Sequence, residues 1–249
     1  RFSANEFGYS DEPFSLKIGR NTFRADYMEL DLSDEDYSLR GKIYFSEFTR
    51  IKTSILSPNI MGYFAYIPFM ECYHGVISMS HCLNGHVVLD GVIIDFSDGR
   101  GYIEKDWGTS FPKEYVWFQS NNFKGSDASI MCSVARIPFL GTSFQGFICN
   151  LTLNGREYRF ATYNRSKVLK LSCTSKSADV TLARGSLKIE AHAEISDEGT
   201  LIAPKKGAMN ATVKEGLNGI VHLKLTDKSG TIFEGEGNPC GIELVRDLH

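Results

Sequence analysis

Two carboxylate side chains stand two residues apart in the segment 101–108, which reads G-Y-I-E-K-D-W-G. If this segment is an extended strand, Glu104 and Asp106 project to the same face, about 6.6 Å apart at roughly 3.3 Å per residue. Like charges at this separation, once removed from water, raise the pKa of at least one group and keep it protonated near neutral pH. A retained proton is what a general acid needs, so the pair is a candidate for acid catalysis.

Aromatic and amide side chains alternate with apolar ones in the next predicted strand, which follows a bend at 108–112. Alternation places Val116 and Phe118 on one face. The opposite face then carries two aromatic and two amide side chains that can contact a ligand: Tyr115, Trp117, Gln119 and Asn121. Such a face suits an apolar ligand with one polar end.

The charged triplet Glu104-Lys105-Asp106 has two other interpretations. Charge triplets usually face water, so a solvated strand edge is the more common outcome for this pattern taken alone. In the second interpretation, the triplet forms an internal ion-pair network that fastens two parts of the fold together. Alternation also groups Tyr102 with the two acids and puts Ile103, Lys105 and Trp107 on the opposite face, so both groups line one pocket only if the strand bends.

Cys72 and His74 share one face of an earlier segment, opposite Glu71 and Tyr73. A cysteine and a histidine at this spacing can begin a metal site, but no second pair of ligands with suitable spacing is present in the sequence. We therefore expect His74 to be a hydrogen-bonded lining residue that helps to position or protonate a ligand.

Strand patterns dominate the elements that must position these residues. Apolar and polar residues alternate through 187–195 and again through 221–226, whereas helical periodicity is nearly absent. The dipeptides Asn84-Gly85 and Asn154-Gly155 predict tight hairpin turns, and 227–230 predicts a third. The first of these turns would place His81 and His86 at a solvated hairpin tip. Short strands joined by local turns indicate antiparallel meanders that close into barrels or sandwiches.

The polar stretch 121–127 is the best candidate for a boundary, because it divides the chain into two similar parts. We predict two β halves, 1–122 and 123–249.

With 27 basic and 30 acidic residues, the sequence carries no electrostatic footprint for nucleic acid. It also has no apolar run of the roughly 20 residues that cross a bilayer. Six scattered cysteines indicate reduced thiols in a cytoplasmic protein.

Four motifs resemble tocopherol cyclase and its bacterial relatives: S-P-N-I-M-G at 57–62, P-F-M-E-C-Y-H-G-V-I-S-M at 68–79, G-R-G-Y-I-E-K-D-W-G-T-S-F-P at 99–112 and W-F-Q-S-N-N-F at 117–123. The resemblance continues weakly to the C-terminal region. It implies an all-β protein with two linked lipocalin-like halves, distantly similar to carotenoid hydratases of the hydroxyneurosporene synthase type and to fungal Diels-Alderases. The G-W-Y-F-K-like strand that usually begins the family is not found here, so we expect an incomplete first barrel.

The chemistry implied by the resemblance is closure of a ring by protonation of a prenyl double bond and capture of the tertiary cation by a phenol oxygen. It requires no redox cofactor, nucleotide or metal. Asp106 is the implied acid and Glu104 the alternative, while His74 or Tyr73 assists the phenol. The remaining candidates contact a prenylated or isoprenoid ligand, either by steadying cationic charge or by holding a polar head group: Tyr102, Lys105, Trp107, Tyr115, Trp117, Gln119 and Asn121.

A non-catalytic, lipocalin-like carrier of an apolar metabolite is the competing prediction, in which the same residues only line a pocket. In either case we expect a small apolar ligand and no nucleic acid as partner. We also expect no stable insertion into a membrane; peripheral contact with a membrane is one route by which a cytoplasmic protein reaches a lipid substrate.

Overall fold

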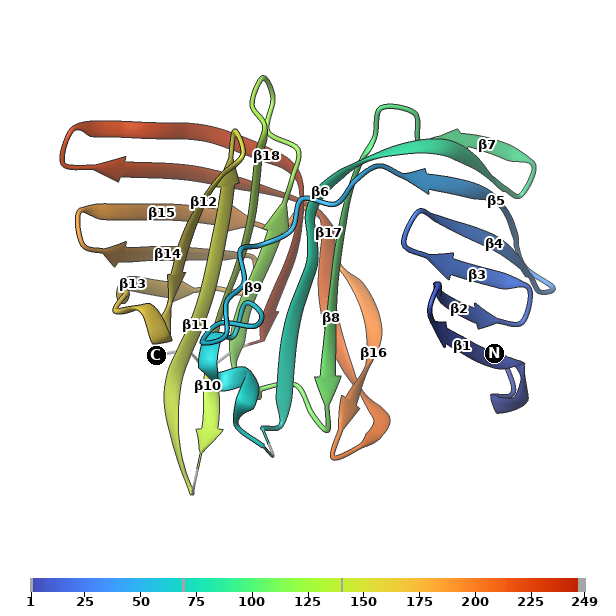
Figure 1. The fold of residues 1–249 in the computed structure, drawn as a ribbon, viewed down its shortest axis with the longest axis horizontal. Coiled ribbons are helices and arrows are strands. Elements are labelled where there is room, and N and C mark those ends of the chain that lie inside the picture. Colours follow the sequence, from blue (N-terminus) through green and yellow to red (C-terminus); the bar gives the residue numbers. More distant parts are fainter. Residues whose placement is uncertain (1, 69, 140, 246–249) are drawn as a thin grey trace. The chain divides into compact units, whose positions relative to one another are not determined.

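Antiparallel strands make up most of the regular structure in the computed structural model, which describes residues 2–68, 70–139 and 141–245 (Figure 1). Within these residues three short 3₁₀ helices interrupt the strands. The elements in chain order are η1 (Ala4–Glu6), β1 (Phe7–Asp11), β2 (Phe14–Ile18), β3 (Asn21–Arg24), β4 (Tyr27–Ser33), β5 (Ser38–Phe45), η2 (Gly62–Tyr66), β6 (Cys72–Leu89), β7 (Val92–Asp95), β8 (Arg100–Gly108), β9 (Tyr115–Ser120), β10 (Ala128–Phe139), β11 (Thr142–Leu153), β12 (Arg156–Ala161), η3 (Thr162–Asn164), β13 (Lys167–Cys173), β14 (Ser177–Arg184), β15 (Leu187–Glu194), β16 (Gly199–Lys205), β17 (Ala208–Asp227) and β18 (Gly230–Val245).

The strands form two antiparallel sheets. The first has the order β1-β2-β3-β4-β5-β6-β7, with β8 also paired to β6. The second has the order β12-β11-β10-β9-β18-β17-β15-β14-β13, with β16 also paired to β17. Among the described residues each path ends in strands with a single neighbour, so hydrogen bonding does not close either sheet into a barrel. The predicted all-β class is confirmed.

The chain forms two compact units that are not continuous in sequence. One contains residues up to 49 and 80–102, and the other contains 50–79 and the chain from 103 onward. The division predicted at residue 122 falls between β9 and β10, which pair from Tyr115↔Ala135 to Ser120↔Ile130. Strand pairing, rather than the polar composition of 121–127, therefore decides which residues share a sheet.

The larger unit has its core on one face of the second sheet. Val116 and Phe118 of β9 are fully buried there, together with alternate residues of the neighbouring strands. In β15 the alternation is as predicted, since Ile189, Ala191 and Ala193 are buried and the residues between them are not. The core takes up the side chains on one face of this sheet. The side chains on the other face of β9, β10 and β11 face the cavity described below.

Two of the three predicted hairpin turns are confirmed. Asn154 and Gly155 have φ of 48° and 74° and connect β11 to β12, as a type I′ turn requires. The turn 227–230 connects β17 to β18. The prediction for Asn84-Gly85 is wrong, because both residues lie inside β6 and the chain turns later, at Asp90-Gly91.

The close approach of β5 explains the glycine at position 85. Its φ is +123°, and a Cβ atom there would lie 2.3 Å from the carbonyl oxygen of Lys42. Gly85 therefore permits tight pairing between strands instead of a turn. The solvated position predicted for His81 is also wrong, because this side chain is buried and its ring contacts Phe45 and Phe48.

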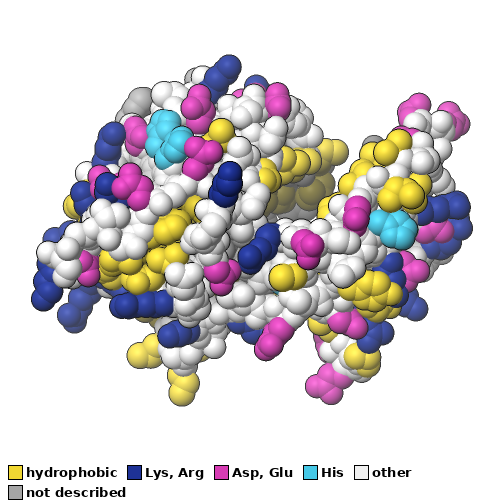
Figure 2. Space-filling view, turned by 90° about the horizontal axis from the view of Figure 1, so that it is seen from above, with side chains coloured by type: hydrophobic (Ala, Val, Ile, Leu, Met, Phe, Trp, Pro, Cys, Tyr) yellow, Lys and Arg dark blue, Asp and Glu magenta, His cyan; other side chains and the backbone are white. Residues whose placement is uncertain are grey.

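On the face drawn in Figure 2, acidic, basic and histidine side chains are interspersed, and apolar side chains reach the surface in several places. Large exposed apolar residues include Ile55, Leu56 and Tyr66, which belong to the segment that precedes β6. Among the described residues, none of the helices is long and apolar enough to cross a membrane.

Arg159 of β12 anchors the segment that begins at residue 50. Its guanidinium donates to the carbonyl oxygen of Lys52 at 2.6 Å and to Ser57 Oγ at 3.0 Å. Glu157 completes the arrangement, since its carboxylate accepts from Arg159 Nε at 2.6 Å and from the Lys52 amide at 2.7 Å. The same segment supplies Met61 and Phe64 to the cavity, so this anchor positions part of the cavity wall.

Candidate active site

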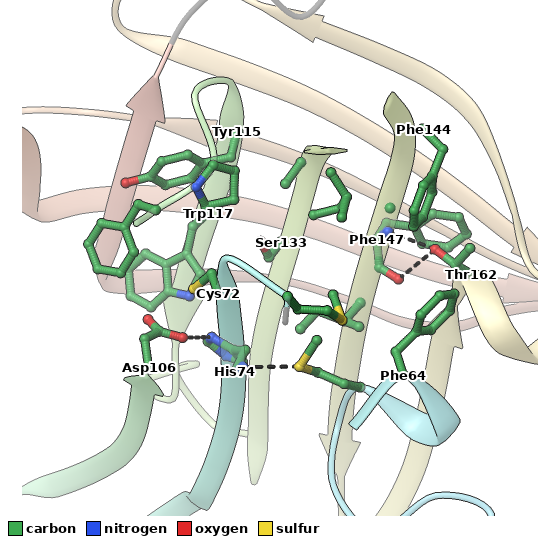
Figure 3. A pocket seen from close by; sticks show the side chains of 18 of the residues that line it. Phe64, Cys72, His74, Asp106, Tyr115, Trp117, Ser133, Phe144, Phe147 and Thr162 are labelled. Atoms are coloured by element: carbon green, nitrogen blue, oxygen red, sulfur yellow. Dashed lines mark hydrogen bonds and ion pairs between the residues drawn. The ribbon is translucent and has the colours of Figure 1, made fainter. Parts of the chain in front are cut away.

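A cavity in the larger unit lies between two sets of strands (Figure 3). One wall comes from β6 and β8, which pair with each other and present Cys72, His74, Glu104 and Asp106. The opposite wall is the non-core face of the second sheet. Because β9 alternates, the burial of Val116 and Phe118 in the core turns Tyr115 and Trp117 toward the cavity.

His74 sits between the two carboxylates that the sequence places on one face of β8. Its Nδ1 lies 2.6 Å from Asp106 Oδ1, and its Nε2 lies 3.2 Å from Glu104 Oε2. Burial by itself lowers the pKa of His74, but the hydrogen bond with Asp106 and the contact with Glu104 outweigh it and raise the pKa to about 10. At neutral pH the imidazole is therefore protonated, and Nδ1–H donates to Asp106.

Protein stability should decrease between about pH 6.5 and pH 10 as His74 loses its proton. The pKa of His74 is raised from 6.5 to about 10 by folding, so its stabilising effect is complete below 6.5 and is lost as the pH passes through 10. Urea unfolding of the wild type and of His74→Gln at several pH values measures this. The difference in unfolding free energy should shrink by a few kcal/mol across the range. A constant difference would contradict the protonated state.

A third carboxyl group, that of Glu243 of β18, reaches the same cavity. It is directly opposite Trp117 in the β18–β9 ladder, and its Oε2 accepts a short hydrogen bond from the Tyr115 hydroxyl. Burial raises the pKa of Glu243 to about 7, against the lowering effect of the Tyr115 hydrogen bond, and the charges of Glu215, Glu104 and Asp106 raise it further. Burial, together with the same glutamate, also raises the pKa of Tyr115 well above its usual range.

The other end of the cavity is apolar. In Figure 3 Phe64, Phe144 and Phe147 lie at the end away from His74 and Asp106, with Ser133 between the two groups. The cavity volume is about 130 Å³. A cavity of about 150 Å³ in another protein holds one benzene ring, so the space here can enclose the reacting part of a larger ligand, such as one ring or one branched alkenyl group.

The side chains of His74, Glu104 and Asp106 also offer ligand atoms within 4.8 Å of one another, a donor set that suits a divalent cation. However, the two carboxylates contact opposite nitrogens of the imidazole ring. A metal ion bound to one ring nitrogen meets only one carboxylate unless the side chains rearrange. The arrangement fits a proton on His74 better than a metal ion.

The predicted site residues fall into three places. The cavity brings together His74, Glu104, Asp106, Tyr115 and Trp117. On the opposite face of β6 and β8, three residues pack against one another: the Tyr73 and Trp107 rings stack at 5.4 Å, and Lys105 Nζ lies 4.9 Å from the Trp107 ring. Outside the set that lines the cavity are Tyr102, which belongs to the smaller unit, and Gln119 and Asn121, at the far end of β9 and beyond it.

Sequence reasoning missed Glu243 and most of the apolar wall. Glu243 stands between Ile242 and Leu244 in a run that is otherwise apolar, and an isolated acid in such a run was the available signal. Its position beside Trp117 depends on pairing between strands far apart in the sequence. Nothing in the local pattern of either strand predicts that pairing.

The fold and cavity define an all-β protein whose apolar pocket ends in a cluster of acid and base groups. The family model for Tocopherol cyclase-like proteins matches residues 46–245, and the chain belongs to this family. It is 26% identical over 106 residues to the probable chloroplastic tocopherol cyclase of Oryza sativa subsp. japonica, a match that covers 41% of this chain and 23% of that protein. The chloroplastic tocopherol cyclase of Zea mays is 31% identical over 74 residues, covering 30% of this chain and 16% of that protein.

These matches span less than a quarter of the length of the two plant relatives. Among solved structures, kievitone hydratase from Nectria haematococca superimposes with a TM-score of 0.52 and 11% identity, over 93% of this chain and 71% of that chain. This likeness and the two antiparallel sheets confirm the predicted lipocalin-like fold class. The family match confirms the predicted resemblance.

Proposed function

We propose that the protein catalyses an acid-promoted intramolecular cyclisation of a prenylated aromatic substrate, without a redox step. The observation that carries this proposal is the position of His74, held between Asp106 and Glu104 at the acidic end of an apolar, aromatic-lined cavity. Membership of the Tocopherol cyclase-like family supports the cyclase-type activity. The specific substrate class and the protonation mechanism are part of the proposal.

In this mechanism a proton is added to the substrate's double bond and leaves a tertiary cation. The ring faces of Trp117 and Tyr115 stabilise that positive charge, as do the neighbouring carboxylates. The phenol oxygen then attacks the cation and loses its proton. Asp106 already accepts a hydrogen bond from protonated His74, so its carboxylate is positioned to receive a proton rather than to supply one. This role differs from that of the acid implied by the sequence resemblance.

Incubation of the 249-residue chain with a prenylated hydroquinone in detergent micelles tests the proposal. The expected product has the same mass as the substrate and a different chromatographic retention, because cyclisation is an isomerisation. Native mass spectrometry of the same samples records bound substrate. A ligand that binds and is never converted would identify a carrier instead and would exclude the cyclase.

A further inference from the structure

The cavity holds more acidic groups than its cation can balance. Glu104, Asp106 and Glu243 line it, and Glu215 of β17 is directly opposite Glu243 in the β17–β18 ladder. Among the described residues that line the cavity, His74 is the only cation. Four carboxyl groups therefore lie around one imidazole in a part-buried site, and an excess of buried negative charge is relieved when a group takes up a proton.

Glu243 is the carboxyl group best placed to hold that proton. Glu104 and Asp106 each form an ion pair with His74, at 3.2 Å and 2.6 Å. The partner of Glu243 is the neutral Tyr115 hydroxyl, which donates to Oε2 and leaves Oε1 as the oxygen that can carry a proton. Burial and the three neighbouring carboxylates raise the pKa of Glu243 to about 7, although the hydrogen bond from Tyr115 partly opposes this.

The thiol of Cys72 does not change the charge balance of the cavity. Cys72 of β6 lines the cavity, and burial, with a contribution from the charge of Asp106, raises the pKa of its thiol to about 12. It is therefore neutral at physiological pH. Lys105 lies on the opposite face of β8, over the Trp107 ring.

We propose that Glu243 is the catalytic acid that protonates the substrate's double bond, with Tyr115 as the hydrogen-bond donor that stabilises the carboxylate formed. This inference rests on the proposed cyclase function and names the acid of that same site. The two proton transfers then use different residues on opposite walls of one cavity. Glu243 on β18 donates a proton, and Asp106 on β8 accepts one.

The proton balance of the cycle closes without an oxidant or a reductant. The Glu243 O–H bond breaks as a C–H bond forms on the less substituted alkene carbon, and the positive charge develops on the tertiary carbon. The phenol oxygen forms a C–O bond to that carbon, and its proton passes to the Asp106 carboxylate. The product is an isomer of the substrate, and exchange with solvent returns the proton from Asp106 to Glu243.

The test compares Glu243→Gln with the matched variant Glu215→Gln, which removes the carboxylate directly across the ladder. Glutamine keeps the shape of the side chain and can still accept from Tyr115. We expect turnover in Glu243→Gln to decrease by about 100- to 10,000-fold, with substrate binding retained in a tryptophan fluorescence titration. Glu215→Gln should keep turnover within about tenfold of the wild type, since it only alters the field at Glu243.

The pH profile of turnover gives a readout that a purely structural role would not move. Wild-type turnover should decrease as the pH rises through about 7, because the acid loses its proton. Tyr115→Phe removes a hydrogen bond that lowers the pKa of Glu243, so this decrease should shift to higher pH. Glu243→Asp should recover part of the activity lost in the glutamine variant.

Two results would overturn the assignment, and they are distinguishable. If the wild type and Glu243→Gln cyclise the substrate equally well, Glu243 is not the acid although the cyclase function stands. If the folded wild type converts no prenylated hydroquinone, both the function and the assignment that rests on it are wrong. A Tyr115→Phe profile that coincides with the wild-type profile would contradict the role of the tyrosine.

Discussion

Replacing Asp106 with asparagine is expected to lower turnover by about 100- to 10,000-fold, the usual contribution of a positioned acid or base. Asp106 makes the shorter of the two contacts with His74, 2.6 Å against 3.2 Å for Glu104, and it lines the cavity where the phenol proton must be received. Asparagine has nearly the same shape but cannot take up a proton. Steady-state kinetics with a prenylated hydroquinone measures the loss.

Glu104→Gln is the matched control for this change, because it neutralises the other carboxylate on the same face of β8. The longer contact of Glu104 with His74 predicts a smaller decrease in turnover than Asp106→Asn gives. Lys105→Met, on the opposite face, should have little effect on turnover. A larger loss in Glu104→Gln than in Asp106→Asn would reverse the assignment of the base between the two acids.

Arg159→Leu is expected to decrease the free energy of unfolding by about 3 to 5 kcal/mol. The guanidinium and the Glu157 carboxylate are about one-tenth exposed, so removing the arginine leaves a buried carboxylate without its charged partner. The substitution also removes the hydrogen bonds to Lys52 and Ser57 that anchor the segment carrying Met61 and Phe64. Urea denaturation followed by circular dichroism measures the change.

Arg156→Leu provides the control on the same strand, since Arg156 is exposed and the substitution removes its cation–π contact with Tyr158. Its effect should stay below about 1 kcal/mol. The double variant Arg159→Leu Glu157→Leu should be more stable than Arg159→Leu alone, because the unpaired buried charge is then absent. If the single variant is as stable as the wild type, the network does not anchor this segment.

Local sequence patterns were sufficient to predict the strand character of the fold. Period-two alternation identified β15 and the inward face of β9, where Val116 and Phe118 enter the core. The Asn-Gly signal was reliable only where no other strand approached. At Asn154-Gly155 it forms a turn, whereas at Asn84-Gly85 the same backbone freedom permits close contact with β5. A dipeptide does not show which use applies.

The candidate site was only partly predictable for a similar reason. Alternation along β8 correctly separates Glu104 and Asp106, which line the cavity, from Lys105 and Trp107, which do not. The wall that faces them depends on pairing between β9 and β18, and that pairing brings Glu243 beside Trp117. Long-range pairing of this kind is set by the packing of the whole sheet, so the separate strand sequences do not reveal it.

Cyclisation in deuterium oxide shows whether the enzyme protonates the double bond of the substrate. If an acid of this cavity protonates the double bond, each product molecule should carry one deuterium on the carbon next to the new C–O bond, detected by mass spectrometry after exchangeable deuterium is washed out. Asp106→Asn and Glu243→Gln should form the same labelled product more slowly. A cyclised product without carbon-bound deuterium would contradict alkene protonation as the mechanism.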